Sequence, residues 1–140
     1  MRHGITLPEL ALSLAICGLL LGIAVPKLDA LRDTLAVEQA AQEVAGAHRR
    51  TRIMAIMLGR TMVLSVTPES LTIRPPGDTT SWRARGPSFA GVALQGPAHD
   101  ITFSPVGITT GVSNATYRLT RGASTRAVVL SRLGRVRITP

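Results

Sequence analysis

The sequence is poor in the side chains that build metal sites, disulfides and aromatic surfaces. It has one cysteine, three histidines and 3% aromatic residues in 140 positions. Because Cys17 is alone, it permits no intramolecular disulfide and no cysteine-based zinc cluster. The histidines, His3, His48 and His99, are scattered and lack the spacing of metal ligands. We therefore expect no metal and no cofactor.

Acidic residues are scarce as well. There are 8 Asp and Glu against 16 Lys and Arg, which gives a formal net charge of +8, and every basic residue except Lys27 is an arginine. The acids beyond residue 60, Glu69, Asp78 and Asp100, are far apart in sequence. No Gly-x-Ser-x-Gly elbow, Gly-rich phosphate loop or His-Glu-x-x-His motif occurs. We expect a protein that is not an enzyme. A membrane-anchored enzyme would need a polar pocket, and no motif in the sequence indicates one.

Length and composition indicate one compact domain with an appendage. Apolar residues make up 45% of the chain and charged residues 17%, so most of it should fold rather than stay disordered. A chain of 140 residues is too short for two full domains.

The appendage is an apolar run over residues 5–25 whose only charge is Glu9. As a helix it would be roughly 31 Å long, enough to cross a hydrocarbon core of about 30 Å. A removable secretory signal is the alternative. However, the run is longer than a usual signal core, carries a carboxylate and lacks an Ala-x-Ala exit.

Charges on either side of the run predict its orientation. Arg2 precedes it, whereas the basic residues that follow, Lys27 and Arg32, are offset by Asp29 and Asp33. The positive-inside rule then places the N-terminus in the cytoplasm and the body outside it.

The residues around Glu9 carry a family resemblance. Gly4-Ile5-Thr6-Leu7-Pro8-Glu9-Leu10, the apolar run and then Pro26 resemble the class III signal of type IV pilins and type II secretion pseudopilins. The resemblance implies that a prepilin peptidase cuts between Gly4 and Ile5 and that the new N-terminus is methylated. It also implies that Glu9 neutralises the N-terminus of a neighbouring subunit during assembly. Two departures are Ile5, where phenylalanine is usual, and Pro8, where an aliphatic residue is more common.

Residues 27–58 predict an amphipathic helix. The stripe that should pack on a sheet contains Val37, Ala40, Val44, Ala47, Thr51, Ala55 and Leu58. Pro26 predicts a kink or melted turn near residues 22–26, or else the end of the membrane helix. Gly59 is a candidate stop, and we interpret His48, beside the stripe, as a packing or surface residue.

After Gly59 the periodicity changes to two, which predicts an antiparallel sheet packed on the helix. The expected strands are 61–67, 70–74, 101–103, 115–120, 126–131 and 135–138, with one short strand at 89–94 in an irregular segment over 79–100. The fold class is therefore α+β, of the type IV pilin kind. Its expected parts are a leader at 1–4, a transmembrane helix at 5–26, an amphipathic helix at 27–58 and a sheet domain at 59–140.

The C-terminal half resembles the FimT/GspH family of minor pilins and minor pseudopilins. The resemblance is carried by Ile101-Thr102-Phe103-Ser104-Pro105-Val106-Gly107, Val128-Val129-Leu130-Ser131 and Gly134-Arg135-Val136-Arg137. It implies a subunit present in few copies near the tip of a filament, with other pilin or pseudopilin subunits as partners.

Arginines dominate this end of the chain. No acidic residue follows Asp100, whereas six arginines do: Arg118, Arg121, Arg126, Arg132, Arg135 and Arg137. Fixed positive charges without carboxylates create a potential that attracts polyanions. In the last strand Arg135 and Arg137 should share one face. Arg83 and Arg85 are candidates to extend that surface.

The motif Gly134-Arg135-Val136-Arg137 resembles the DNA-binding Gly-Arg-x-Arg of FimT-type minor pilins that serve natural transformation. The alternative is an ordinary hairpin with solvated arginines. DNA binding would be electrostatic, independent of sequence and sensitive to salt. Because the body has only four aromatic residues, Trp82, Phe89, Phe103 and Tyr117, double-stranded DNA fits better than a stacked single strand. We interpret Trp82 as a packing anchor.

Two functions follow from these patterns. The first is a FimT-like minor pilin that is anchored in the inner membrane with a periplasmic body, joins a type IV pilus at the cell surface and binds extracellular DNA. The second is a GspH-like minor pseudopilin at the tip of a type II secretion pseudopilus, with protein partners. The two share the helix and differ at the C-terminal arginines.

Overall fold

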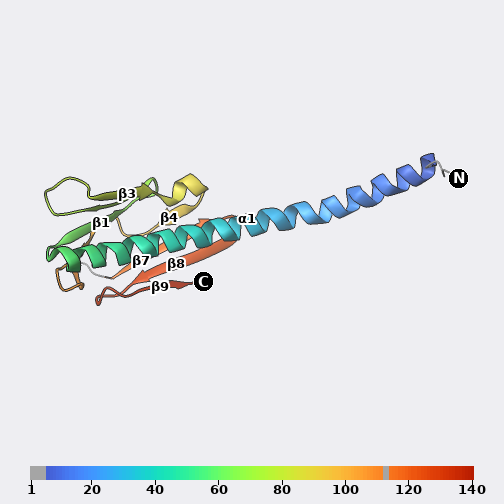
Figure 1. Ribbon diagram of the computed structural model, residues 1–140. Helices are drawn as coiled ribbons and strands as arrows, with labels where there is room; N and C mark the ends of the chain where they lie inside the picture. The colour runs from blue at the N-terminus through green and yellow to red at the C-terminus, as the bar shows by residue number, and fades with distance from the viewer. Residues whose placement is uncertain (1–5, 112–113) are drawn as a thin grey trace. The chain divides into compact units, whose positions relative to one another are not determined.

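The computed structural model describes residues 6–111 and 114–140, and the expected cleavage point at Gly4 and Ile5 lies outside these residues. The long α-helix, α1, spans Leu7–Leu58 (Figure 1). The chain divides into two compact units, Met1–Arg32 and Asp33–Pro140. Residues 22–26 are helical throughout, so no turn is melted there.

The described part of the first unit is apolar helix. An 18-residue window of α1 near the N-terminus has a mean hydropathy of 2.1, and none of it is buried. Large side chains such as Leu12, Leu14 and Leu19 are more than 60% exposed. By length and composition, this helix is able to cross a membrane.

The second unit holds two antiparallel sheets. The five-stranded sheet has the order β3-β2-β1-β5-β6, and the four-stranded sheet has the order β4-β7-β8-β9. The strands of the first are β1 (Met62–Val66), β2 (Ser70–Arg74), β3 (Trp82–Arg85), β5 (Ile101–Phe103) and β6 (Thr109–Thr110). Those of the second are β4 (Ala93–Gln95), β7 (Ala115–Arg121), β8 (Ser124–Leu130) and β9 (Val136–Thr139), and the short helix η1 is Pro87–Ala90.

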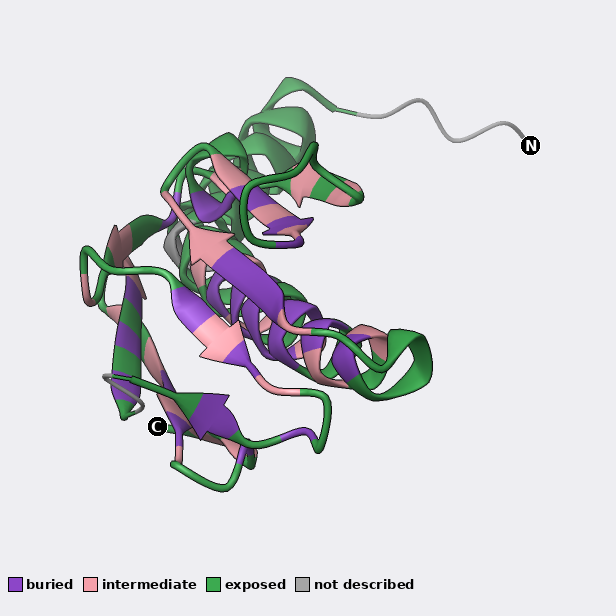
Figure 2. Ribbon diagram, turned by 90° about the vertical axis from the view of Figure 1, so that its left-hand side faces the viewer, coloured by how far each residue is buried: buried purple, intermediate pink, exposed green. Residues whose placement is uncertain are grey.

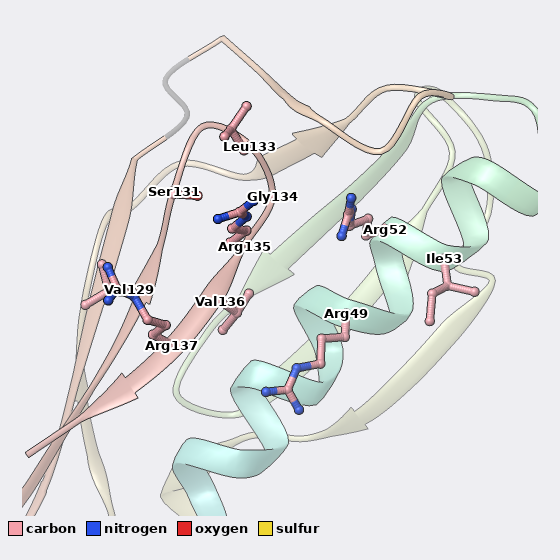
Figure 3. A pocket seen from close by; sticks show the side chains of 10 residues that line it. All are labelled: Arg49, Arg52, Ile53, Val129, Ser131, Leu133, Gly134, Arg135, Val136 and Arg137. Carbon is pink, nitrogen blue, oxygen red and sulfur yellow. The ribbon is translucent and has the colours of Figure 1, made fainter.

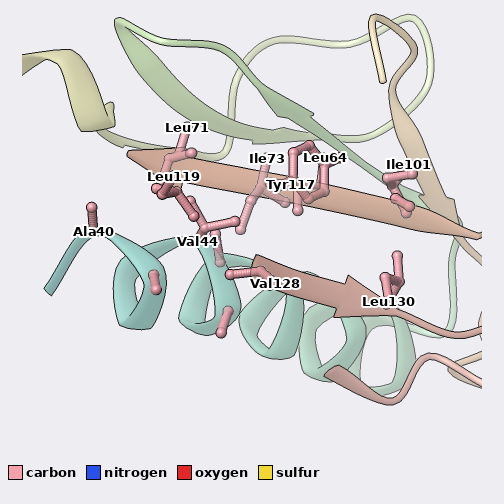
Figure 4. Close-up of a cluster of buried hydrophobic side chains, with 14 of the residues drawn as sticks. Ala40, Val44, Leu64, Leu71, Ile73, Ile101, Tyr117, Leu119, Val128 and Leu130 are labelled. Carbon is pink, nitrogen blue, oxygen red and sulfur yellow. The ribbon is translucent and has the colours of Figure 1, made fainter. Parts of the chain in front are cut away.

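The core lies between α1 and both sheets. In Figure 4 the helix residues Ala40 and Val44 lie beside side chains from both sheets, Ile73 on β2 and Leu119 on β7 among them. Alternate residues of the strands are buried in the same core (Figure 2). The helix contributes small side chains, including Ala41 and Ala45, which are 0% exposed. Because these alanines have no bulk beyond Cβ, the helix packs closely on the sheets.

The helical stripe agrees with the prediction except at its end. Val37, Thr51 and Ala55 are buried, but Leu58 is 51% exposed. Leu58 is the last residue of α1, and Gly59 follows with a φ of 59°. The amide of Arg60 then donates to the carbonyl of Ala55 at 3.2 Å, a pattern typical of a helix C-terminus.

The strands differ from the prediction in three ways. They form two sheets, whereas a single sheet was expected. The strand expected at 89–94 is divided between η1 and β4, and two short strands, β3 and β6, were not predicted. Gly86, which precedes η1, lies against the backbone of Pro68 and Ser70, where a side chain has no room.

Candidate nucleic-acid interface

The register of the four-stranded sheet sorts the C-terminal arginines onto two faces. Arg118 lies opposite Ala127, and Arg137 lies opposite Val129. These positions alternate with the buried Tyr117, Leu119 and Val128, so Arg118 and Arg137 share the outer face. Arg126 lies opposite Leu119 and therefore belongs to the face that packs on α1.

The arginines on the helix side are paired with carboxylates of α1. Arg121 Nε donates to Asp33 Oδ1 at 2.8 Å, and Arg126 Nε donates to Glu38 Oε2 at 2.9 Å. Arg121 also donates through Nη1 to the carbonyl of Ala90. Hydrogen bonds from Gln42 and Arg126 lower the pKa of the Glu38 carboxyl, so the Glu38 pair is charged at neutral pH. Because carboxylates neutralise both guanidinium groups, Arg121 and Arg126 are less available to DNA than an unpaired arginine.

The other four C-terminal arginines are exposed. Within the part of the chain that the structure describes, no ion pair or hydrogen bond is recorded for the side chains of Arg118, Arg132, Arg135 and Arg137. Their guanidinium groups are thus available to an external anion.

A tight turn over residues 131–135 presents Arg132 and Arg135. The amide of Gly134 donates to the carbonyl of Ser131 at 2.9 Å, and the amide of Ser131 donates to the carbonyl of Arg135 at 2.9 Å. Gly134 has a φ of 70°, and a Cβ there would lie 2.7 Å from the carbonyl oxygen of Gly107. The turn therefore requires glycine on two counts, backbone conformation and space.

A groove lies between this turn, β9 and the C-terminal half of α1 (Figure 3). Its volume is about 820 Å³. Arg49, Arg52 and Ile53 line it from α1, and Arg135 and Arg137 line it from the turn and β9, with Arg137 on the outer face of the sheet. The remaining lining residues are Val129, Ser131, Leu133, Gly134 and Val136.

The groove has four arginines and no acidic residue among its lining side chains. Arg49 is exposed, whereas Arg52 is half-buried and donates from Nε to the carbonyl of Gly107 at 2.9 Å. That bond orients the Arg52 guanidinium and leaves its Nη groups for another acceptor. Arg49 and Arg52 were not predicted from the sequence, because both lie outside the packing stripe of the helix and belong to no motif.

Arg83 and Arg85 do not extend this surface. They belong to β3, at the edge of the other sheet. The guanidinium carbon of Arg85 lies 5.3 Å from the ring centroid of Phe89, and that of Arg50 lies 5.0 Å from the centroid of Trp82. Trp82 is half-buried against the core, in agreement with its interpretation as a packing residue.

His48 and Tyr117 lie in the core rather than in the groove. The His48 ring is fully buried, 5.3 Å from the ring of Tyr117, and Nδ1 lies 2.8 Å from the carbonyl oxygen of Val44. Burial lowers the pKa of His48 to about 4 and, with a smaller contribution from the charge of Asp100, raises the pKa of Tyr117 to about 12. Both side chains are therefore neutral at physiological pH, and His48 is a packing residue.

Glu9 lies in the first turn of α1, and its carbonyl accepts a hydrogen bond from Ser13 Oγ at 2.8 Å. A carboxylate at this end of a helix is favoured by the exposed amides. Over residues 6–111 and 114–140, no group of three His, Cys, Asp or Glu side chains is arranged to hold a metal ion.

Comparison with known proteins places these features in a family. Residues 40–134 match the family model of the type II transport protein GspH. A curated relative, the pilin-like protein PilA1 of Thermus thermophilus, is 34% identical over 155 aligned positions that cover 98% of each chain.

Two crystal forms of the type IV minor pilin FimU from Pseudomonas aeruginosa PAO1 share the fold. Their TM-scores are 0.64 and 0.61, at 17% and 16% identity, and they cover 74% of this chain and 88% and 92% of theirs. The predicted α+β fold, a long N-terminal helix on antiparallel sheet, is confirmed. Family and fold are those of structural pilins, and the apolar helix fits a membrane-anchored subunit. The chain belongs to the GspH family of minor type IV pilins and pseudopilins.

Proposed function

We propose that the protein is a minor pilin that binds extracellular DNA for natural transformation through its C-terminal arginines. The observation that carries this proposal is the groove, where Arg135 and Arg137 are exposed beside further arginines and no carboxylate is present among the lining residues. Arginines that displace counterions from phosphates give weak binding that is independent of sequence. Arg118 and Arg132 add exposed charge nearby, and Gly134 shapes the turn. No catalytic step is part of this function.

The proposal includes a route to the filament. A prepilin peptidase would cut between Gly4 and Ile5, and Glu9 would then pair with the N-terminus of a neighbouring pilin. Before assembly the apolar helix would hold the protein in the inner membrane with its body in the periplasm. The support is Arg2 ahead of the apolar run and the offset of Lys27 by Asp29 behind it.

The experiment compares two double variants that remove the same charge. Full-length protein in detergent micelles is titrated with a double-stranded DNA of random sequence at several salt concentrations. Arg135→Gln/Arg137→Gln should weaken binding by about tenfold or more and reduce the salt slope by about 2. Arg121→Gln/Arg126→Gln should have the smaller effect, because those guanidiniums are already paired with Asp33 and Glu38.

The unfolding midpoint of each variant is the control for folding. Each half-exposed ion pair contributes at most about 1 kcal/mol, so Arg121→Gln/Arg126→Gln should still fold. DNA affinity that is unchanged in Arg135→Gln/Arg137→Gln would remove the motif from the mechanism.

The second candidate is a minor pseudopilin at the tip of a type II secretion pseudopilus. The match to the GspH model favours it, as do exposed apolar side chains such as Met57 and Val106, which are 79% and 72% exposed and suit a protein partner. A deletion strain separates the two: loss of transformation with secretion intact supports the DNA-binding pilin, and the reverse supports the pseudopilin.

A further inference from the structure

The α1 wall of the groove carries positive charge that the Gly-Arg-x-Arg motif does not account for. Arg49, Arg52 and Ile53 are spaced three and one residues apart, so they lie on one side of the helix. All three line the groove together with Arg135 and Arg137, and the Arg137 side chain extends from β9 away from α1 (Figure 3). The two walls are separated by more than 80 positions in sequence, and only the packing of α1 beside β9 brings them together.

The two α1 arginines are prepared for an anion in different ways. Arg52 is held by its bond to the carbonyl of Gly107, so its planar guanidinium loses little further freedom on binding. Arg49 is exposed, and no ion pair or hydrogen bond of its side chain is recorded within the described residues. The oxygens of one phosphate group can accept hydrogen bonds from both guanidinium groups.

We propose that α1 supplies half of a two-walled phosphate site, in which Arg49 and Arg52 bind the same phosphodiester backbone as Arg135. Arg137 then binds that backbone where it leaves the groove over the outer face of the sheet. A groove of about 820 Å³ has the volume of a small-molecule site, so it admits a short run of backbone while the rest of the DNA stays outside. In this arrangement the deoxyribose sugars of the DNA lie beside the aliphatic side chains of the groove, which are Ile53, Leu133 and Val136. The identification of the ligand as DNA rests on the proposed function, whereas the two-walled site rests on the groove.

Arg50 provides a matched control. It is adjacent to Arg49 on α1, also exposed and of the same charge, but it stacks on Trp82 and does not line the groove. If the net charge of the helix alone attracted DNA, removing either arginine would have the same effect. If the groove binds the backbone, only Arg49 matters.

The test measures the affinity of full-length protein in detergent micelles for double-stranded DNA as a function of salt. Arg49→Gln should weaken binding about three- to tenfold and reduce the salt slope by about 1, whereas Arg50→Gln should leave the slope unchanged. Equal effects of the two variants overturn the α1 wall, even if Arg135→Gln/Arg137→Gln abolishes binding and the proposed function stands.

A second probe, inorganic tripolyphosphate, separates the site from the identity of its ligand. Binding of tripolyphosphate that is lost in Arg49→Gln and kept in Arg50→Gln, together with no DNA binding by the wild-type protein, would support the site and overturn the DNA-uptake function. Failure of both probes to bind the wild-type protein would overturn both proposals.

Discussion

At the scale of the residue, His48 shows how a titratable group is used as a packing group. Nδ1 donates to the carbonyl of Val44, and Nε2 has no hydrogen-bond partner among the described residues. The ring is buried against Tyr117. A second proton on this ring would place an unpaired charge in the core, so the folded protein binds that proton only at low pH.

This arrangement predicts a loss of stability in mild acid. The pKa of His48 is about 4 in the folded protein and about 6.5 in the unfolded chain. The unfolded state therefore binds more protons between these values, and stability falls as pH is lowered through them. We expect a loss of about 1.5 kcal/mol between pH 6.5 and pH 5, measured by chemical unfolding.

His48→Gln should abolish this slope, while His99→Gln, at an exposed position, should retain it. A wild-type protein whose stability does not change between pH 6.5 and pH 5 would contradict a neutral, buried His48.

Single residues also show why sequence could predict only part of the site. Alternation along the strands placed Arg135 and Arg137 together, because a strand has a period of two. The pairing of Arg121 with Asp33 joins residues 88 positions apart, which no local pattern reports. Arg49 looked like any solvated helix residue, and its role in the groove depends on where β9 packs.

At the scale of the element, α1 presents two different surfaces within a single turn. Ala45 is 0% exposed against the sheets. A Cβ on the next residue, Gly46, would meet no atom within 4 Å. The same helix is therefore closely packed on one side and open on the other.

A larger side chain at each of these two neighbouring positions should change the free energy of unfolding in opposite directions. Gly46→Ala should stabilise the protein by about 0.5–1 kcal/mol, because alanine restricts the unfolded chain and its methyl group would meet no other atom. Ala45→Leu should destabilise it by about 1–3 kcal/mol through overpacking. Thermal unfolding followed by circular dichroism measures both, and destabilisation by Gly46→Ala would show that the helix is packed on that side too.

The strands that were missed are short ones with weak patterns. In β3 the half-buried Trp82 and Ala84 alternate with the exposed Arg83 and Arg85, but four residues before Gly86 and Pro87 are too few to distinguish a strand from a loop. The longer β7 and β8 were predicted because each has several alternating positions. The division into two sheets follows from long-range pairing, which the local period does not contain.

At the scale of the whole molecule, membership of the GspH family gives the apolar helix its context. Its described side chains before residue 32 are exposed, and other pilin subunits are the partners that the family implies. A carboxylate among apolar side chains is costly unless it is paired. Glu9 is therefore proposed to direct assembly.

We expect Glu9→Ala to reduce incorporation into filaments by about tenfold or more, since the N-terminus of the neighbour would lose its partner. Immunoblots of sheared filaments measure this, and Glu43→Ala, at an exposed carboxylate later in α1, is the matched control. Mass spectrometry should find that both variants begin at Ile5. Normal incorporation of Glu9→Ala would refute the assembly role, and an intact Met1 would refute the cleavage.

The charged side chains of the groove are guanidinium groups alone, and this has a practical consequence for labelling. Guanidinium groups keep their charge at any pH that the fold survives, so the attraction for phosphate should persist while His48 titrates in the core. Lys27 is the one lysine in the chain. Amine-directed dyes, surface tethers and cross-linkers will therefore react at Lys27 or at the chain terminus, and they will leave the arginines of the groove chemically untouched.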